Sequence, residues 1–369
     1  MFKVSNFNQD QKLFWTVASL VVIGLIMISS AGVIYSQTRF GDQYFFLKRQ
    51  LFFGVVPGFF VLYFLSKFNY HRLKKLAAPF FIVSIIFLIL VFVPGVGTEV
   101  YGANRWVQLG PISFQPSEMV KLAMVLYLAA WLESKGHRKL RDFYEGFLPF
   151  IAVLGIAGFL IIKQPDTGTL GIIILSSIAI YFASGARISY ILGMILAGIG
   201  GLAVLIKIAP YRLNRFLVFL NPETDPQGIG YQINQALIAI GSGGIFGMGL
   251  GHSRGKFNYL PEPAGDSIFA IIGEEMGMLG AGIIVLLFVL LAVKGFGIAK
   301  KAPDEFGKLV AVGITSWIVF QAFINIAAIT GIIPLTGIPL PFISYGGTSL
   351  IFLLAGVGIL INISKQSKL

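Results

Sequence analysis

Apolar stretches long enough to cross a lipid bilayer recur along the whole chain. The hydrocarbon core of a bilayer is about 30 Å thick, so a helix needs roughly 20 apolar residues to cross it. The sequence predicts ten such spans, at residues 13–35, 50–66, 76–94, 117–132, 147–162, 169–183, 189–209, 267–293, 309–330 and 347–363. Because little polar sequence is left between them, we expect an all-α polytopic integral membrane protein, with residues 1–369 forming one transmembrane domain.

Basic residues gather in the connections on one side of these spans. If the N-terminus lies inside, the cytoplasmic segments hold 17 of the 28 Lys and Arg residues but only six of the 16 acidic residues. This excess is the positive-inside pattern of membrane proteins. Both termini are therefore expected in the cytoplasm, and the net charge of +12 is explained by topology rather than by nucleic-acid binding.

The segments on the outer side are rich in glycine, proline and polar residues. They cover residues 95–116, 163–169, 210–266 and 331–349, and the third is a large loop between the seventh and eighth spans. Irregular backbone near a membrane is tolerated where protein buries it or where it lines a wet cavity. We therefore expect any chemistry on the outer side, with short amphipathic helices at 211–220 and 230–240 inside the large loop.

Three carboxylates stand at the start of the eighth span, in YLPEPAGDSIFAIIGEEMG. Asp266 precedes the span, where it could cap the helix or act as a general base, and these two roles are compatible. Glu274 and Glu275 lie roughly 12–14 Å further along the helix. A charge inside a membrane is costly, so each glutamate is expected to face a polar cavity or a partner.

A second charged pair lies in QPSEMVKL, where Glu118 and Lys121 are three residues apart. This spacing places both on one helix face, either as a structural ion pair or as a pair that sets the charge of a neighbouring acid or binds phosphate. Asp166, in QPDTGT, could pair with Lys121 across helices in a mainly structural role.

Possible anion sites lie on two outer segments. Arg212 and Arg215 are also three residues apart, and their guanidinium groups suit a pyrophosphate or a lipid headgroup as well as a general interfacial anchor. The segment SYGGTS, with Ser344, Gly346 and Gly347, opens the last span with free N–H groups, which could bind an anion or form a packing turn.

Several common functional patterns are absent from the sequence. The glycine-rich GSGGIFGMGLG has no GxGxxG register and no strand before it, which argues against a dinucleotide site. The three histidines are scattered, the chain has no cysteine, and no Walker motif is present. The sequence therefore predicts neither a metal cluster nor ATP hydrolysis.

Long motifs carry a resemblance to a known family. They are GANRWVQLGPISFQPSEMVKLAMVLYLA, KQPDTGTL, FLNPETDPQGIGYQINQALIAIGSGGIFGMGLGHSRGKFNYLPEPAGDSIFAIIGEEMG and TGIIPLTGIPLPFISYGGTSL. Together they span nearly the whole chain in order and resemble the SEDS proteins (shape, elongation, division and sporulation), with GLGHSRGKFNYLPEP closer to the division members than to the elongation members. The resemblance implies a peptidoglycan glycosyltransferase of the bacterial inner membrane. It would polymerise lipid II outside, beside a class B penicillin-binding protein transpeptidase and other divisome membrane proteins.

The resemblance also implies site residues. The family's essential aspartate falls on Asp266, and the Glu and Lys of its QPSE-x-x-KL motif fall on Glu118 and Lys121. The family motif usually reads His-Thr-Asp-Phe where this chain has Ala264–Gly265–Asp266–Ser267. The aspartate is kept while its neighbours differ, which puts its local hydrogen bonding in question.

This chemistry leads to a mechanistic hypothesis. Asp266 would remove the proton from the 4-hydroxyl of the acceptor GlcNAc, which attacks C1 of the donor MurNAc. Inversion would form a β-1,4 bond and release undecaprenyl pyrophosphate. Arg212, Arg215 or Lys121, together with a divalent cation (Mg²⁺ or Mn²⁺) if one is bound, would stabilise the charge of the leaving group.

Three alternatives remain open. The first is a lipid II flippase or another transporter, for which alternating access favours symmetric halves and charges on both sides of the midplane. Here the charges crowd at the outer mouth instead. The second is an elongation-type polymerase. The third is a non-catalytic scaffold of a division complex, in which replacing Asp266 by Asn would leave polymer synthesis intact.

Overall fold

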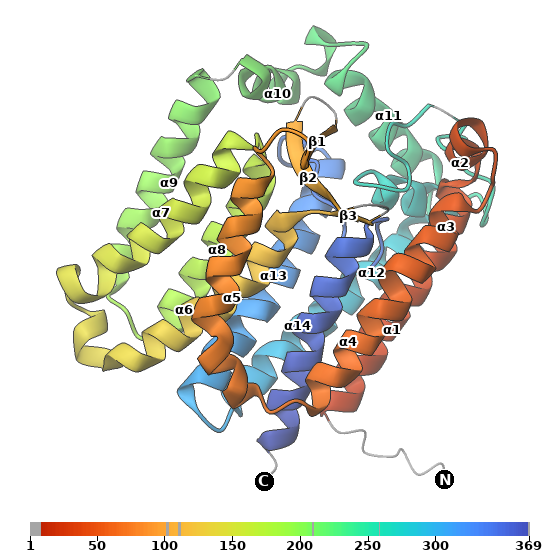
Figure 1. Ribbon diagram of the computed structural model, residues 1–369. Helices are drawn as coiled ribbons and strands as arrows, with labels where there is room; N and C mark the ends of the chain where they lie inside the picture. Colours follow the sequence, from red (N-terminus) through yellow and green to blue (C-terminus); the bar gives the residue numbers. More distant parts are fainter. Residues whose placement is uncertain (1–8, 101–102, 110–111, 209, 258, 368–369) are drawn as a thin grey trace, which may run out of the picture.

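The computed structural model describes residues 9–100, 103–109, 112–208, 210–257 and 259–367, and these residues form a mainly helical protein (Figure 1). Its elements in chain order are α1 (Gln9–Ala31), α2 (Val33–Phe40), α3 (Phe45–Gln50), the π-helical turn η1 (Leu51–Val55), α4 (Val56–Lys67), α5 (Tyr70–Leu90), β1 (Gly97–Val100), β2 (Ala103–Leu109), β3 (Ile112–Phe114), α6 (Pro116–Leu140), the π-helical turn η2 (Phe143–Phe147), α7 (Leu148–Lys163), α8 (Thr167–Ala183), α9 (Ile188–Ile208), α10 (Pro210–Leu220), the 3₁₀ turn η3 (Pro222–Thr224), α11 (Ile229–Ser242), α12 (Ile268–Lys300), α13 (Glu305–Ile329) and α14 (Gly347–Gln366).

Helices that can cross a membrane make up most of the fold. Among the described residues, eight segments are long and apolar enough to do so: Asp10–Ala31, Phe45–Lys67, Tyr70–Leu90, Phe143–Lys163, Ile188–Ile208, Ile268–Lys300, Glu305–Ile329 and Gly347–Gln366. The chain is therefore a multi-pass membrane protein. The apolar α8 has 17 residues, and α6 carries charged residues along its length. The expected number of ten spans stays a prediction, which requires that these two helices cross as well.

The bundle has two distinct ends. Figure 1 shows the small sheet together with α10 and α11 at one end, which we call the sheet end. The first turn of α1 and the last turn of α14 lie together at the opposite end, which we call the terminal end. Helices α10 and α11 confirm the two short helices expected within the large loop. Lys3 and Lys368, counted on the inner side from sequence, lie outside the described residues.

Two helices form the centre of the bundle. About two thirds of the most apolar window of α13 is buried, and 78% of that of α14, against 11% for α9. Helix α13 packs against α12, α8 and α6, while α14 packs most closely against α4. The outer helices therefore present apolar side chains outward, as expected for surfaces in contact with lipid.

A three-stranded antiparallel sheet forms within residues 95–116, so the irregular backbone expected in this segment was wrong, while the mainly helical architecture is confirmed. Strand β2 lies in the middle, between β1 and β3. Val107 is buried and Gln108 is exposed, which is the alternation of a strand with one covered face. The many glycines and polar residues around this short alternating run obscured the strand signal in the sequence.

Helix α12 is interrupted at Gly277, which has φ 65° and ψ −168°. A break frees backbone groups that must find other partners inside a membrane protein. The loop after α11 supplies them through four hydrogen bonds: Met248 N to Glu274 O, Gly249 N to Glu275 O, Met278 N to Gly244 O and Leu279 N to Ile245 O. The predicted eighth span is thus a short helix and a long helix joined at a glycine.

Candidate functional site

Asp266 lies two residues before α12, at the sheet end. The N-cap of α12 is Ser267, and no side chain caps this helix end, so the capping role considered for Asp266 was wrong. The Asp266 carboxylate instead accepts a long hydrogen bond of 3.4 Å from the Ser267 hydroxyl. Besides this bond, the carboxylate interacts with the backbone N–H of Asp266 itself, and the described residues place no cationic donor on its oxygens at ion-pair distance.

The backbone around Asp266 is held at three consecutive carbonyls. The Ala264 carbonyl accepts from the Tyr345 N–H at 2.8 Å, and that of Gly265 accepts from the Ser344 hydroxyl at 2.7 Å. The Asp266 carbonyl accepts from the Asn325 side-chain amide at 2.9 Å. Because all three bonds end on main-chain oxygens, the side chains at positions 264 and 265 are not needed to hold the aspartate.

Charge and burial act together on Asp266. Burial raises the pKa of its carboxyl to about 6, and the nearby Glu262 carboxylate pushes in the same direction. The Ser267 hydrogen bond and the positive charge of Arg215 oppose this rise. A carboxylate with a pKa near 6 is mostly ionised at neutral pH and still basic enough to share a proton, which suits a general base.

Arg215 is the cation of this site. Burial lowers the pKa of its guanidinium, Arg105 lowers it further, and Asp266 and Asp166 oppose the shift. Its Nη1 donates to the carbonyl of Leu335 at 3.2 Å, which ties α10 to the loop before α14. Arg215 is therefore close enough to Asp266 and Asp166 for their charges to act on it.

Arg105 belongs to the same group of charges and was not predicted as a site residue. Its Nε and Nη2 donate to the carbonyls of Gln164 and Pro165 at 3.0 and 2.6 Å. The guanidinium thereby joins β2 to the turn before α8. The available signal was a single arginine in the outer segment GANRWVQLGP, which was attributed to the general motif alone.

Asp166 caps α8, accepting from the Thr169 N–H at 3.1 Å. The ion pair expected between Asp166 and Lys121 is not found in the described part of the chain, because Lys121 pairs with Glu118 at 2.8 Å. Both side chains of that pair are almost fully buried. Glu118 and Lys121 therefore form a buried ion pair, as their structural role predicts.

The Glu118–Lys121 pair connects to the loop before α14 through α13. Lys121 Nζ donates to Gln321 Oε1 at 2.8 Å, and Gln321 Nε2 donates to the Pro339 carbonyl at 3.0 Å. One turn later, the Asn325 amide donates to the Ile338 carbonyl at 2.7 Å as well as to that of Asp266. The buried pair thus supports the same loop that holds Asp266.

Arg212 shares a face of α10 with Arg215, as the spacing predicts. Its guanidinium lies over the Tyr211 ring, 5.0 Å from the ring centre. Within the described residues, its Nε has no hydrogen-bond partner. The Nε atom itself is buried, so an anion site at Arg212 stays a prediction.

Glu274 and Glu275 bind the loop that follows α11. Glu274 accepts from the backbone N–H groups of Arg254 and Gly255, and Glu275 accepts from the Ser30 hydroxyl of α1 at 2.6 Å. Glu275 also forms a buried ion pair of 3.2 Å with Lys256. Both carboxylates thus have structural partners, as expected for charges within a membrane helix.

The turn at SYGG is partly occupied by protein contacts. Ser344 binds the Gly265 carbonyl, and the Gly346 N–H donates to Gln50 Oε1 at 3.0 Å. Gly346 is therefore not free to bind an anion through its N–H. Gly347 begins α14 and lines a cavity, so an anion site at this helix end stays a prediction.

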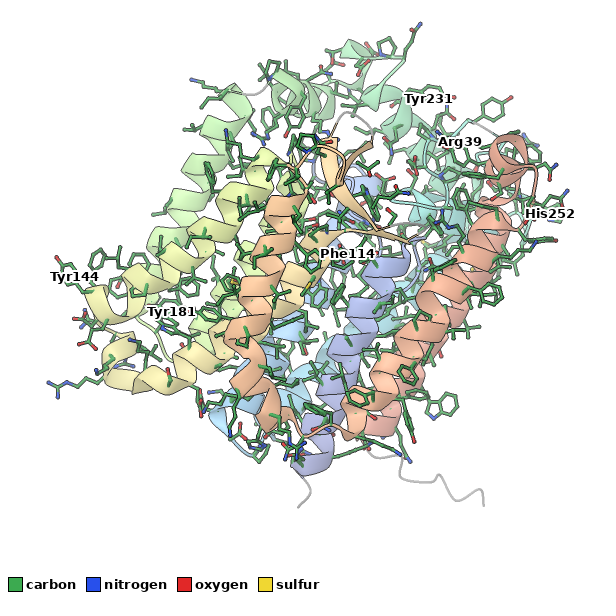
Figure 2. All side chains as sticks on the ribbon, in the orientation of Figure 1. Arg39, Phe114, Tyr144, Tyr181, Tyr231 and His252 are labelled. Atoms are coloured by element: carbon green, nitrogen blue, oxygen red, sulfur yellow. The ribbon has the colours of Figure 1, made fainter. Side chains whose placement is uncertain are left out.

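This cavity has a volume of about 610 Å³ and lies between α4, the sheet and the start of α14. It is lined mainly by aromatic and apolar side chains, with one cation at its wall: Arg49, Phe52, Phe53, Pro57, Trp106, Ser113, Phe114, Tyr345, Gly346, Gly347, Thr348, Ile351 and Phe352. Figure 2 labels Phe114 near the centre of the bundle, below the rest of the sheet. Tyr345 links the cavity to the site, since its N–H binds the Ala264 carbonyl.

No group of three or more His, Asp or Glu side chains in the described ranges is arranged to hold a metal ion. Asp266, Glu262 and Asp166 are the carboxylates whose charges act on this site. A divalent cation at this site stays a prediction.

Comparison with known proteins places these residues in a family. A family model described as "Cell cycle protein", covering FtsW, RodA and SpoVE, matches residues 11–369. The chain is 44% identical over 349 residues to the "Stage V sporulation protein E" of Bacillus subtilis, and 40% identical over 349 residues to the "Probable peptidoglycan glycosyltransferase FtsW" of a Geobacter species. In both cases 95% of each chain is covered.

Solved structures show the same fold. A chain from a complex described as a peptidoglycan synthase that coordinates polymerization and crosslinking matches with a TM-score of 0.77 at 28% identity, over 96% of this chain and 97% of that one. The rod shape determining protein RodA of Thermus thermophilus matches with a TM-score of 0.70 at 27% identity, over 97% of both chains. The arrangement of helices described above is therefore shared with these proteins.

Proposed function

The chain belongs to the family of cell cycle proteins that includes FtsW, RodA and SpoVE, and we propose that it is a peptidoglycan glycosyltransferase with Asp266 as its general base. The observation that carries this proposal is the Asp266 carboxylate. It is fixed through its backbone, lacks a strong side-chain donor, and has a pKa raised to about 6. The names of its relatives point to the same activity.

The substrate is lipid II, a disaccharide-peptide joined through pyrophosphate to a polyprenyl chain. Such a molecule needs a polar site for its sugars, cations for its pyrophosphate and apolar surface for its tail. The sheet end offers Asp266 with Arg215 and Arg212, next to a cavity with aromatic walls. We assign the lipid-proximal part of one substrate to this cavity, where Arg49 supplies positive charge.

The reaction is a displacement at the donor sugar. Asp266 accepts the proton of the acceptor GlcNAc 4-hydroxyl as that oxygen bonds to C1 of the donor MurNAc. The bond from C1 to the pyrophosphate oxygen breaks with inversion, so a β-1,4 linkage forms and undecaprenyl pyrophosphate leaves with the electron pair. The activated donor supplies the driving force, and no nucleotide is consumed.

Arginines rather than Lys121 stabilise the leaving group. Lys121 is buried in its pair with Glu118 and donates to Gln321, so its ammonium is already engaged by the protein. Among the described residues the Arg212 Nε has no hydrogen-bond partner, and Arg215 lies among the charges around Asp266. A guanidinium binds pyrophosphate through several donors held in one plane. A divalent cation carried by the pyrophosphate would add to this charge.

The proposed setting is the bacterial cytoplasmic membrane, crossed ten times. The sheet end then faces outward and both termini face the cytoplasm, as the distribution of basic residues predicts. A class B penicillin-binding protein that crosslinks the new strands is the proposed partner. The similarity to a chain from a peptidoglycan synthase complex supports it. Relatives named FtsW support a role in septal synthesis with other divisome proteins.

The proposal is tested by giving lipid II to purified wild type and Asp266→Asn, each with and without a class B penicillin-binding protein. Products are resolved on a gel that separates glycan strands. Strands from the wild type and none from a folded Asp266→Asn protein are expected. Equal strand synthesis by both would remove Asp266 as the base. If neither makes strands, lipid II translocation in liposomes distinguishes a flippase from an inactive scaffold.

A further inference from the structure

Gln50 holds the loop before α14 through both ends of its side-chain amide. Its Oε1 accepts from the Gly346 N–H at 3.0 Å, and its Nε2 donates to the Ser344 carbonyl at 3.4 Å. The residue is 1% exposed and ends α3, where the π-helical turn η1 begins. An apolar residue here would leave a buried donor and a buried acceptor of the loop without these partners, which is costly.

The turn that Gln50 holds also holds the backbone just before Asp266. The Ser344 hydroxyl donates to the Gly265 carbonyl, and the Tyr345 N–H donates to that of Ala264. Gln50 is therefore separated from the backbone before Asp266 by a single layer of residues. A shift of the Ser344–Gly346 turn would be passed directly to that backbone.

The contact between η1 and α14 is too close to allow independent movement. A Cβ on Gly54 would lie 3.2 Å from the Gly347 Cα, and one on Gly347 would lie 2.8 Å from the Phe53 carbonyl oxygen. In an α-helix the N–H of residue 57 would donate to the Phe53 carbonyl, but Pro57 has no N–H. The preceding Val56 N–H donates to the Leu51 carbonyl, five residues earlier, which is the hydrogen bond of a π-helix. The local π geometry thus brings η1 against the start of α14.

We propose that Gln50 is a positioning residue, which fixes the Ser344–Gly346 turn and through it the orientation of the Asp266 carboxylate toward the acceptor hydroxyl. This inference rests on the proposed function. Arg49, the preceding residue, lines the cavity, whereas Gln50 does not. Two consecutive residues therefore have separate tasks, one toward the bound substrate and one toward the general base.

Gln50→Met keeps the approximate size of the side chain and removes both hydrogen bonds. We expect kcat for lipid II polymerisation to fall about tenfold to a hundredfold, because small misplacements of a catalytic group have effects of this order. KM should stay within about twofold, as expected when orientation rather than binding is lost. A looser turn admits water to Asp266 and weakens the effect of burial, which lowers the pKa of its carboxyl. The acid limb of the pH–rate profile should therefore move to lower pH.

The chain contains a matched control at the terminal end. Asn362 also bridges helices with both ends of its amide, accepting from the Tyr70 N–H at 3.3 Å and donating to the Ser66 carbonyl at 3.0 Å. Asn362→Leu removes a comparable buried amide far from Asp266. It should lower thermal stability and leave the acid limb of the profile in place. A purely structural role for Gln50 predicts the same behaviour from both variants.

Hydrogen exchange gives a readout that does not depend on activity. In Gln50→Met, peptides covering residues 340–346 should exchange faster than in the wild type, while those covering 356–364 should not change. If exchange increases and kcat and the acid limb stay as in the wild type, the positioning role is wrong.

A second variant covers the case in which Gln50→Met does not fold. Gln50→Glu retains an acceptor for Gly346 and loses the donor to Ser344, so its kcat should also fall, and an unchanged value would overturn the proposal. Activity retained by Asp266→Asn would instead refute the proposed general base, which keeps the two failures apart.

Discussion

Two nearby charges act on the pKa of Asp266 in opposite directions. Glu262 raises it and Arg215 lowers it, on top of the larger effect of burial. The ionised fraction of Asp266 therefore depends on the balance of its neighbours. Substitution of either neighbour should therefore change the pKa of Asp266 while the aspartate itself is kept.

Replacing these neighbours should move the acid limb of polymerisation in opposite directions. Glu262→Gln removes a negative charge, so the pKa of Asp266 falls and the limb moves to lower pH. Arg215→Met removes a positive charge, so the pKa rises and activity at pH 6 falls more than activity at pH 8. The measurement is kcat/KM for lipid II between pH 5 and 8. Shifts in the same direction for both variants would contradict this assignment.

Single residues were predictable from sequence where a chemical type stood out against its surroundings. Asp266 and the Glu118–Lys121 pair could be selected because charges are rare in apolar spans. Partners could not be selected, because they depend on packing between distant segments. The spacing of Glu118 and Lys121 predicts their pairing within one helix, but the cross-helix alternative of Asp166 with Lys121 is wrong, and no pattern predicts that Arg105 joins β2 to the turn before α8.

Glycine breaks and short strands shape the elements around the site. Gly277 adopts positive φ, and a Cβ there would lie 2.4 Å from the Gly247 nitrogen and 2.5 Å from the Ile245 carbonyl oxygen. Apolar residues continue on both sides of Glu274 and Glu275 and glycine is common in this span, so the break at Gly277 could not be predicted from periodicity. The sheet could not be predicted because its alternating apolar and polar run is too short to stand out from the surrounding sequence.

Gly277→Ala should destabilise the protein by about 1–3 kcal/mol from backbone strain, with a further cost from the clash at Gly247. Gly282→Ala is the matched control on the same helix, because no atom lies within 4 Å of a Cβ there. That substitution should be neutral or stabilising by up to about 1 kcal/mol. Thermal unfolding in nanodiscs compares the two. Equal midpoints would argue against a strained break at Gly277.

The buried pair of Glu118 and Lys121 on α6 should show strong coupling. Lys121→Met leaves Glu118 buried without its cation, which we expect to cost about 3–5 kcal/mol. The double variant Glu118→Gln/Lys121→Met removes both charges and should recover a large part of this loss. Unfolding midpoints of the wild type, both single variants and the double variant give the coupling. Additive losses would show that the two side chains act independently.

At the scale of the whole molecule, the two ends of the bundle are built from different elements. The sheet, α10 and α11 gather at one end, and α1 begins and α14 ends at the other (Figure 1). The recurrence of apolar spans was sufficient to predict a multi-pass membrane protein, and the bias of basic residues predicts that the terminal end faces the cytoplasm. The crossing of α6 and α8 was predicted as well, but α6 carries its charges into the bundle and α8 is short.

Cysteine labelling can determine which end faces outward, because the chain contains no cysteine of its own. Thr224→Cys places an exposed thiol at the sheet end, and Lys301→Cys places one between α12 and α13. In intact spheroplasts, a membrane-impermeant maleimide should label the first variant and spare the second. After lysis both should react. The reverse pattern in intact cells would invert the proposed orientation.

The most direct test of Asp266 as the general base is the pH–rate profile of lipid II polymerisation by the wild type, with Asp266→Asn beside it. The base must be ionised to accept a proton, so kcat/KM should rise with pH and level off above an apparent pKa of about 6. The Asn variant should show no such limb and little activity at any pH. A wild-type profile that is flat between pH 5 and 8, or an Asn variant with the same limb, would contradict the account.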